Sequence, residues 1–416
     1  MRIIPRPAYL DWLVRHRDRQ AVRILTGPRG SGKSTILALF REHLLARSAA
    51  PEQLVTIDCE EVTELFRPPD AKDLLGRVLS RLQPDRETHV FLDEPQRVPG
   101  FTDVCAALLA HGGCRLYLAC SGAGPLSGEG GANAAESLRG PDGPPLERLV
   151  LPLSFAEFCA GLVPERKSLP LRDKFALYLA AGSMPWTARL DADREQAREL
   201  LEGNYLAILV RDMGAPRINR RYLDAVARRL LLGIGRRTSP AALARDAPPR
   251  CGPMDPKTAA GGLRLLLQSR LFFEARRFSL KSGTLLRTQS RYYAFDTALR
   301  AAVVGERPGD FDRVLANVVF LELVRRGCAV HSGGCSIPAR EADFIALRDG
   351  APSCWQVRAA VSGPEELSRT IAPLRGIRMP CPKWLLTYDT VPGRKLPGGI
   401  QERNILDWLL DEGASV

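Results

Sequence analysis

The chain has 416 residues, of which 45% are hydrophobic and 25% are charged. This composition excludes a disordered or fibrous chain and, at roughly 100–200 residues per domain, predicts two to four globular domains. The formal net charge of +12 is compatible with binding to nucleic acid, but only 8 of the 59 basic residues are lysine, which is equally typical of a GC-rich genome.

The sequence shows no sign of a membrane-bound, secreted or zinc-binding protein. No stretch of 18 residues is apolar and free of charge, and the first residues do not open an apolar signal segment, so we expect a cytoplasmic protein with no membrane partner. The ten cysteines form no Cys-x-x-Cys pair and are accompanied by five histidines, which predicts reduced thiols.

Strand and helix patterns alternate over residues 1–150. Short apolar runs predict four strands, at 21–26, 54–58, 89–93 and 115–119. Helical periodicity between them predicts helices over 34–47 and 71–82. Strands that alternate with helices indicate an α/β fold with a mostly parallel sheet covered on both faces.

The remainder of the chain reads as a loop and three further segments. Residues 122–145 are rich in glycine, proline and alanine, which predicts a surface loop. Helical patterns fill 151–232, and a helix, helix, hairpin order over 233–303 is that of a winged helix. A helix, four strands and a terminal helix over 304–416 predict a second, smaller α/β domain.

A phosphate-binding loop follows the first predicted strand. The segment Gly27-Pro28-Arg29-Gly30-Ser31-Gly32-Lys33-Ser34 fits the pattern Gly-x-x-x-x-Gly-Lys-Ser, and Thr35 continues the helix that it opens. The glycines allow backbone N–H groups to face phosphates, and the helix N-terminus adds positive potential. We therefore expect residues 27–35 to bind ATP, with Lys33 on the β- and γ-phosphates and Ser34 as a ligand of Mg²⁺.

Further catalytic candidates lie at the ends of the third and fourth predicted strands. Asp93 is the expected second ligand of Mg²⁺, and Glu94 is the expected general base that polarises the attacking water. Ser121 is either a sensor of the γ-phosphate or the serine of an ordinary turn. The arginine that acts on a neighbouring subunit's nucleotide is Arg139 or Arg148.

Several longer motifs are spread over nearly the whole chain. They are the segments 6–10, 92–101, 151–158, 178–185, 292–296, 341–344 and 355–357, together with the phosphate loop. The set resembles the prokaryotic AAA-like P-loop ATPases that carry a C-terminal domain of unknown function related to the restriction-endonuclease fold. The resemblance implies an ATPase core over 1–150, a helical lid or linker over 151–232, a winged-helix module over 233–303 and an endonuclease-like domain over 304–416.

The sequence departs from that family's pattern in the end domain. Ala316 stands where the family often has glutamate. A nuclease of this fold needs a carboxylate at a strand end, then a carboxylate and a lysine on the next strand to hold and use a divalent metal. Here Asp343 is followed by Gln356, a weak ligand, and Arg358, a poor base. We therefore expect a domain that binds or docks and does not cleave DNA.

The predicted winged helix is a candidate for contact with double-stranded DNA. Residue types that contact bases and phosphates lie on its second helix, at its end and on the hairpin: Lys257, Thr258, Arg264, Arg270, Arg276 and Arg277. Against this, Gly261 and Gly262 each weaken the helix by about 1 kcal/mol relative to alanine. Packing against the nucleotide-binding core is the alternative role.

Three functions follow from these observations. The first is Mg²⁺-dependent ATP hydrolysis that drives a switch on DNA or on a protein partner, for which the intact Glu94 argues. The second is a nucleotide-gated DNA-binding or docking regulator with low turnover. The third is a metal-dependent nuclease, against which Ala316 and Gln356 argue. The sequence leaves the oligomeric state open.

Overall fold

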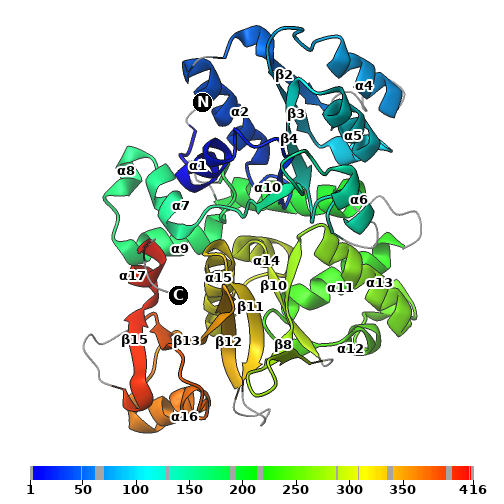
Figure 1. Ribbon diagram of the computed structural model, residues 1–416. Helices are drawn as coiled ribbons and strands as arrows, with labels where there is room; N and C mark the ends of the chain where they lie inside the picture. The colour runs from blue at the N-terminus through cyan, green and yellow to red at the C-terminus, as the bar shows by residue number, and fades with distance from the viewer. Residues whose placement is uncertain are drawn as a thin grey trace. The chain divides into compact units, whose positions relative to one another are not determined.

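The computed structural model describes the whole chain except residues 1–2, 48, 61–69, 128–130, 188–193, 213–218, 287–288, 308, 335–340, 390–395, 412 and 414–416 (Figure 1). The described chain forms two compact units. The N-terminal unit contains Ile3–Pro152 and Gln268–Arg270, and the C-terminal unit contains Leu153–Leu267 and the chain from Leu271 onward.

The N-terminal unit is built on the predicted parallel sheet. Its strand order is β2-β3-β4-β1-β5, and every neighbouring pair is parallel. The strands are β1 (Arg23–Gly27), β2 (Leu54–Asp58), β3 (Thr88–Asp93), β4 (Cys114–Ser121) and β5 (Leu146–Leu149). All four predicted strands are confirmed, and β5 adds an edge strand beside β1.

Helices cover both faces of this sheet, which explains the nearly continuous apolar runs of its strands. Ile24 and Leu92 point into a core closed by α4 (Ala71–Leu79) and α5 (Phe101–His111). Their chain neighbours point to the opposite face, because successive strand residues alternate. That second core is closed by α1 (Pro7–Arg15) and α2 (Lys33–Arg47), on the other side of the sheet (Figure 1).

The segment predicted as a surface loop, 122–145, contains a helix. This is α6 (Gly131–Ser137), and Leu138 directly after it is fully buried in the core with α4 and α5. The prediction of a loop was incomplete. Alanines inside the segment favour a helix, and burial of a single leucine holds this helix against the core. Glycines with positive φ, at Gly122, Gly124 and Gly143, turn the chain on both sides of it.

The C-terminal unit begins with the helices expected over 151–232. They are α7 (Phe155–Gly161), α8 (Pro164–Lys167), α9 (Leu171–Ala181), α10 (Arg194–Ala207) and α11 (Arg220–Leu232). A capping box opens α7: the Ser154 hydroxyl accepts from the N–H of Glu157, whose carboxylate accepts from the N–H of Ser154, at 3.0 and 2.8 Å. This explains the Ser-Phe-Ala-Glu part of the longer motif.

Two helices and antiparallel strands follow in the predicted order. The helices are α12 (Pro240–Arg245) and α13 (Pro256–Gln268), and the small sheet has the order β6-β10-β7. Its strands are β6 (Arg237–Thr238), β7 (Phe272–Ala275) and β10 (Ser290–Ala294). Between β7 and β10, however, β8 (Arg277–Ser279) and β9 (Thr284–Leu285) join the sheet of the last segment. The segments 233–303 and 304–416, which the sequence suggested as separate modules, therefore share a sheet.

That larger sheet has the order β15-β14-β13-β12-β11-β8-β9. Its other strands are β11 (Ala329–Gly334), β12 (Glu341–Arg348), β13 (Ala351–Arg358), β14 (Lys383–Thr387) and β15 (Ile400–Asn404). On β12, Ile345 packs in a core with α16 (Gly363–Arg375), and its neighbour Phe344 packs against Phe320 of α15 (Phe311–Arg325). The helices α14 (Thr297–Val304) and α17 (Ile405–Leu410) complete the unit. Among the described residues, no helix has the length and apolarity needed to cross a membrane.

Candidate nucleotide-binding site

The loop between β1 and α2 has a backbone that only glycine can supply at its first position. Gly27 has φ 142°, and a Cβ there would lie 2.2 Å from the carbonyl oxygen of Val150. Gly30 and Gly32 also have positive φ, 81° and 98°. The glycines of the predicted phosphate loop are thus required by the conformation of the loop itself.

Lys33 is buried at the centre of this loop, with 3% of its surface exposed. Its Nζ donates to the carbonyl oxygens of Gly27 and Pro28, at 3.2 and 3.1 Å, and to Oγ of Ser121 at 3.2 Å. Three neutral oxygens therefore hold the ammonium group at the place where the sequence predicts phosphate.

Glu94 lies next to this lysine, in a left-handed backbone conformation with φ 51° and ψ 41°. Its N–H donates to the carbonyl oxygen of Ala119 at 2.8 Å, which fixes it to the neighbouring strand β4. One carboxylate oxygen accepts from Oγ of Ser121, and the other accepts from Nε2 of Gln96, both at 2.5 Å. Ser121 thus connects Lys33 with Glu94, and three predicted site residues, from α2, from β4 and from the position directly after β3, come together.

Asp93 ends β3 and accepts a side-chain hydrogen bond from Ser34 in the first turn of α2. Burial raises the pKa of Asp93 to about 6, and the nearby Glu94 and Asp58 carboxylates add to the rise. Oδ1 of Asp93 is buried and has no hydrogen-bond partner in the described protein. A hydroxyl and a carboxylate oxygen with spare coordination are hard ligands, so these two side chains fit the predicted Mg²⁺.

The remaining residues of the loop are fixed by contacts around it. Nη2 of Arg29 binds both carboxylate oxygens of Glu60, at 2.8 and 2.9 Å. Ser31 is fully buried, and its Oγ has no hydrogen-bond partner among the described residues. Thr35 is half-buried in α2.

Arg6 is a site residue that reasoning from the sequence assigned no role. It is 5% exposed and donates from Nη1 to the carbonyl oxygen of Ser31 and from Nη2 to that of Leu151, both at 2.8 Å. Its guanidinium also lies 4.4 Å from the ring centre of Tyr9. Arg6 therefore ties α1 to the phosphate loop and to the chain after β5. The available signal was an Arg-Pro pair at the start of a helix.

The two arginine candidates do not join the loop of their own chain. Arg139 pairs with Glu136 at 3.0 Å and has 52% of its side chain exposed. The next residue, Gly140, packs on the carbonyl of Gln20, which precedes β1, so this segment lies at the end of β1 opposite the phosphate loop. Arg148 lies on β5 with its guanidinium 5.8 Å from the ring of Tyr9. Action on a neighbouring subunit stays a prediction for both.

In the C-terminal unit, the expected metal-ligand position is occupied by ion pairs. Oδ2 of Asp343 accepts from the N–H of Val357 at 3.0 Å and from Nη1 of Arg358 at 2.9 Å. Oδ1 of the same carboxylate faces Nη1 of Arg291 at 3.5 Å. Gln356 is buried beside it on β13 with Oε1 lacking a hydrogen-bond partner in the described chain.

The basic residues predicted to face DNA are divided between surface and interior. Lys257 and Arg264 are exposed on α13. Arg277 instead binds Glu341 at 2.7 Å, and burial lowers the pKa of Arg270. Gly262 of α13 faces α11, and a Cβ at this position would make an ordinary contact with Val226 at 3.7 Å.

Residues 19–159 match the family model of an AAA domain. The N-terminal unit has the fold of an AAA-type P-loop ATPase. Solved structures similar to this chain include the Walker-type ATPase PABY2304 of Pyrococcus abyssi. It is 16% identical with a TM-score of 0.53, over 72% of this chain and 96% of that one. Residues 172–310 match a domain of unknown function, DUF8612. An uncharacterized protein of Haemophilus influenzae is 27% identical over 98% of this chain and 99% of its own length.

Proposed function

We propose that the N-terminal unit binds ATP with Mg²⁺ and hydrolyses it, and that the cycle acts as a switch on DNA or on a protein partner. The observation that carries this proposal is the position of the Ser121 hydroxyl between Nζ of Lys33 and the carboxylate of Glu94. One hydroxyl thus links the ammonium group that is proposed to bind phosphate with the carboxylate that is proposed to activate water.

Binding of ATP replaces contacts that the loop now makes with itself. The phosphates are stronger partners for Lys33 than the neutral carbonyl oxygens that it contacts here. Ser34 and Asp93 would hold Mg²⁺, which when bound neutralises charge on the phosphate oxygens. Backbone N–H groups of the loop after Pro28 would face the phosphates.

Hydrolysis is assigned to Glu94 as the general base. Its carboxylate is held in place by Ser121 and Gln96 and takes a proton from the attacking water. When the γ-phosphate draws the Ser121 hydroxyl to itself, that carboxylate oxygen becomes free to accept from water. Ser121 is thereby a sensor as well as part of the catalytic group.

A path for the switch leads away from Ser121 along the backbone. The following residue, Gly122, exchanges two hydrogen bonds with Gly27, at 2.8 and 2.9 Å. Ala123 then donates its N–H to the carbonyl oxygen of Gln268 at 2.6 Å, and its own carbonyl oxygen accepts from Oγ of Ser127 at 2.7 Å. Gln268 is the last residue of α13, so displacement of Ser121 is transmitted to the helix that carries Lys257 and Arg264.

The partner is DNA or protein, and the C-terminal segments supply its binding surface. We assign winged-helix and endonuclease-like character to 233–303 and 304–416 from the longer motifs. The ion pairs of Asp343 with Arg358 and Arg291 favour a docking domain over a nuclease, because these guanidinium groups neutralise the carboxylate that a metal would need. A low-turnover regulator with the same site is the alternative.

The test is ATP hydrolysis by the full chain with Mg²⁺, alone and with double-stranded DNA. We expect Glu94→Gln to keep ATP binding and to lower kcat by about 100-fold or more, since a general base contributes at least that factor. Lys33→Ala should lose ATP binding. Lys72→Ala, an exposed lysine on α4, is the matched control and should behave as wild type.

The outcomes separate the alternatives. If DNA stimulates ATP hydrolysis, and Lys33→Ala and Glu94→Gln both abolish it, the switch acts on nucleic acid. Slow turnover that DNA does not change, and that both variants still abolish, assigns it to a protein partner. Turnover at the wild-type rate in Glu94→Gln contradicts the proposed role of Glu94.

A further inference from the structure

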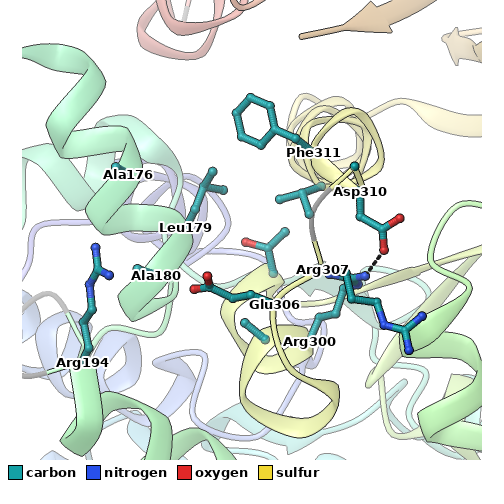
Figure 2. A pocket seen from close by; sticks show the side chains of 13 residues that line it. Ala176, Leu179, Ala180, Arg194, Arg300, Glu306, Arg307, Asp310 and Phe311 are labelled. Atoms are coloured by element: carbon teal, nitrogen blue, oxygen red, sulfur yellow. Dashed lines mark hydrogen bonds and ion pairs between the residues drawn. The ribbon is translucent and has the colours of Figure 1, made fainter.

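The C-terminal unit contains a cavity of about 380 Å³ between α9, α10, α14 and the start of α15. Figure 2 shows its lining, which combines apolar and charged side chains. Leu179, Ala180 and Phe311 supply much of the apolar part. Its size falls within the range of about 300–1,000 Å³ that is usual for small-molecule sites.

One wall of the cavity is a fixed cluster of charges. Arg300 is 3% exposed, donates from Nε to the carbonyl oxygen of Leu231 at 2.9 Å and forms an ion pair with Asp310. The same carboxylate binds Nη1 of Arg313 at 2.7 Å. Two guanidinium groups therefore share one carboxylate, which leaves the wall positive.

More charge comes from the exposed side chains of the cavity. Arg194 lies on α10 at one side, and Glu306 extends from the opposite side toward the middle (Figure 2). Arg307 also lines the cavity, and its charge acts with burial to lower the pKa of Arg300. The lining thus holds three arginines against two carboxylates, a formal excess of one positive charge.

An exposed aromatic ring completes the arrangement. Phe311 is 39% exposed, its ring centre lies 5.4 Å from that of Tyr388, and it lines the cavity together with Leu179 (Figure 2). A flat apolar group placed against this ring and Leu179 would remove both from water. Burial of apolar surface contributes roughly 25 cal/mol per Å².

We propose that this cavity binds a small aromatic monocarboxylate. The carboxylate faces the arginines, which suit it because guanidinium groups bind carboxylates in a bidentate manner. The aromatic part lies against Phe311 and Leu179. Glu306 disfavours ligands with more than one negative charge, which excludes nucleoside triphosphates from this cavity.

The test is a calorimetric titration of the full chain with phenylacetate. Benzyl alcohol and phenyl phosphate are the neutral and dianionic comparison ligands. We expect saturable binding of phenylacetate and weaker binding of the other two. Arg194→Gln and Arg307→Gln should each lower the affinity for phenylacetate by about tenfold, because one charge-assisted hydrogen bond contributes at least that factor to binding. Ala180→Phe, which fills the cavity, should abolish binding.

Two controls locate the site. Arg198→Gln removes an exposed arginine of the same helix α10, where it pairs with Glu202 at 2.9 Å, and should leave the affinity unchanged. Lys33→Ala should also leave it unchanged, so the result is independent of ATP binding. The proposal is overturned if phenylacetate binds wild type, Arg307→Gln and Ala180→Phe with equal affinity, or if wild type shows no saturable binding. If benzyl alcohol binds as tightly as phenylacetate, the role of the arginines is overturned.

Discussion

Replacement of Arg6 by methionine should destabilise the phosphate loop, although Arg6 lies outside the phosphate-loop motif. Methionine keeps much of the length and apolar stem but removes the two hydrogen bonds to the carbonyl oxygens of Ser31 and Leu151. Both residues are at most 1% exposed, so the two oxygens lose a buried charged donor. At about 1–3 kcal/mol for each unsatisfied buried group, we expect the free energy of unfolding to fall by about 2–6 kcal/mol.

The assay is urea unfolding combined with hydrogen exchange read by mass spectrometry, so that the loss is located as well as measured. Faster exchange should concentrate in α1 and in residues 27–35, and the KM for ATP should rise because the loop is no longer held. Arg15→Met is the matched control, since Arg15 is exposed on the same helix and should change stability by less than about 0.5 kcal/mol. If Arg6→Met unfolds within about 0.5 kcal/mol of wild type, Arg6 does not brace the loop.

Two further predictions concern backbone space and thiol chemistry. Gly27→Ala should abolish ATP binding, because its Cβ would meet the carbonyl oxygen of Val150 at 2.2 Å. Gly76→Ala, in open space on α4, should instead raise the free energy of unfolding by up to about 1 kcal/mol. ATP titration checks the first variant and urea unfolding the second, and normal ATP affinity in Gly27→Ala would contradict the first prediction. A hydrogen bond from Cys354 lowers the pKa of Cys381 to about 7, so its thiolate, and with it the rate of alkylation by iodoacetamide, should increase as pH rises through 7. Mass spectrometry of peptides at pH 6 and 8 measures this, and equal labelling at both values would refute it.

The sheet of the N-terminal unit could be predicted because its signals are local. A strand such as β3 is buried on both faces, so its apolar run is visible in the sequence. The large sheet of the C-terminal unit was harder, since β8 pairs with β11 more than fifty residues later. Nothing in the three residues of β8 indicates which of two sheets they join. The two segments were therefore predicted as separate modules.

The same distinction separates the site residues that the sequence reveals from those that it hides. Gly27, Lys33 and Ser34 stand at fixed spacings because one continuous loop must surround phosphate. Arg6 acts instead on backbone carbonyls 25 and 145 residues away, and a carbonyl acceptor leaves no mark in the sequence. The charged cavity is hidden for a related reason, because its arginines come from α10, from α14 and from the chain after α14, which meet only in the folded chain.

The longer motifs of the C-terminal unit are explained by packing more than by chemistry. Asp296 is fully buried and accepts from the N–H of Leu299, which caps α14, and from the N–H and hydroxyl of Ser183. Asn317 is also fully buried and binds both backbone groups of Ala294, at 2.8 and 2.9 Å. These buried side chains satisfy backbone groups that would otherwise be unpaired, so their role is in packing. The chemistry of the C-terminal unit is therefore to be sought among groups that the fold leaves exposed. In its cavity, Arg194 and Arg307 are exposed beside an apolar surface, whereas Arg300 is buried.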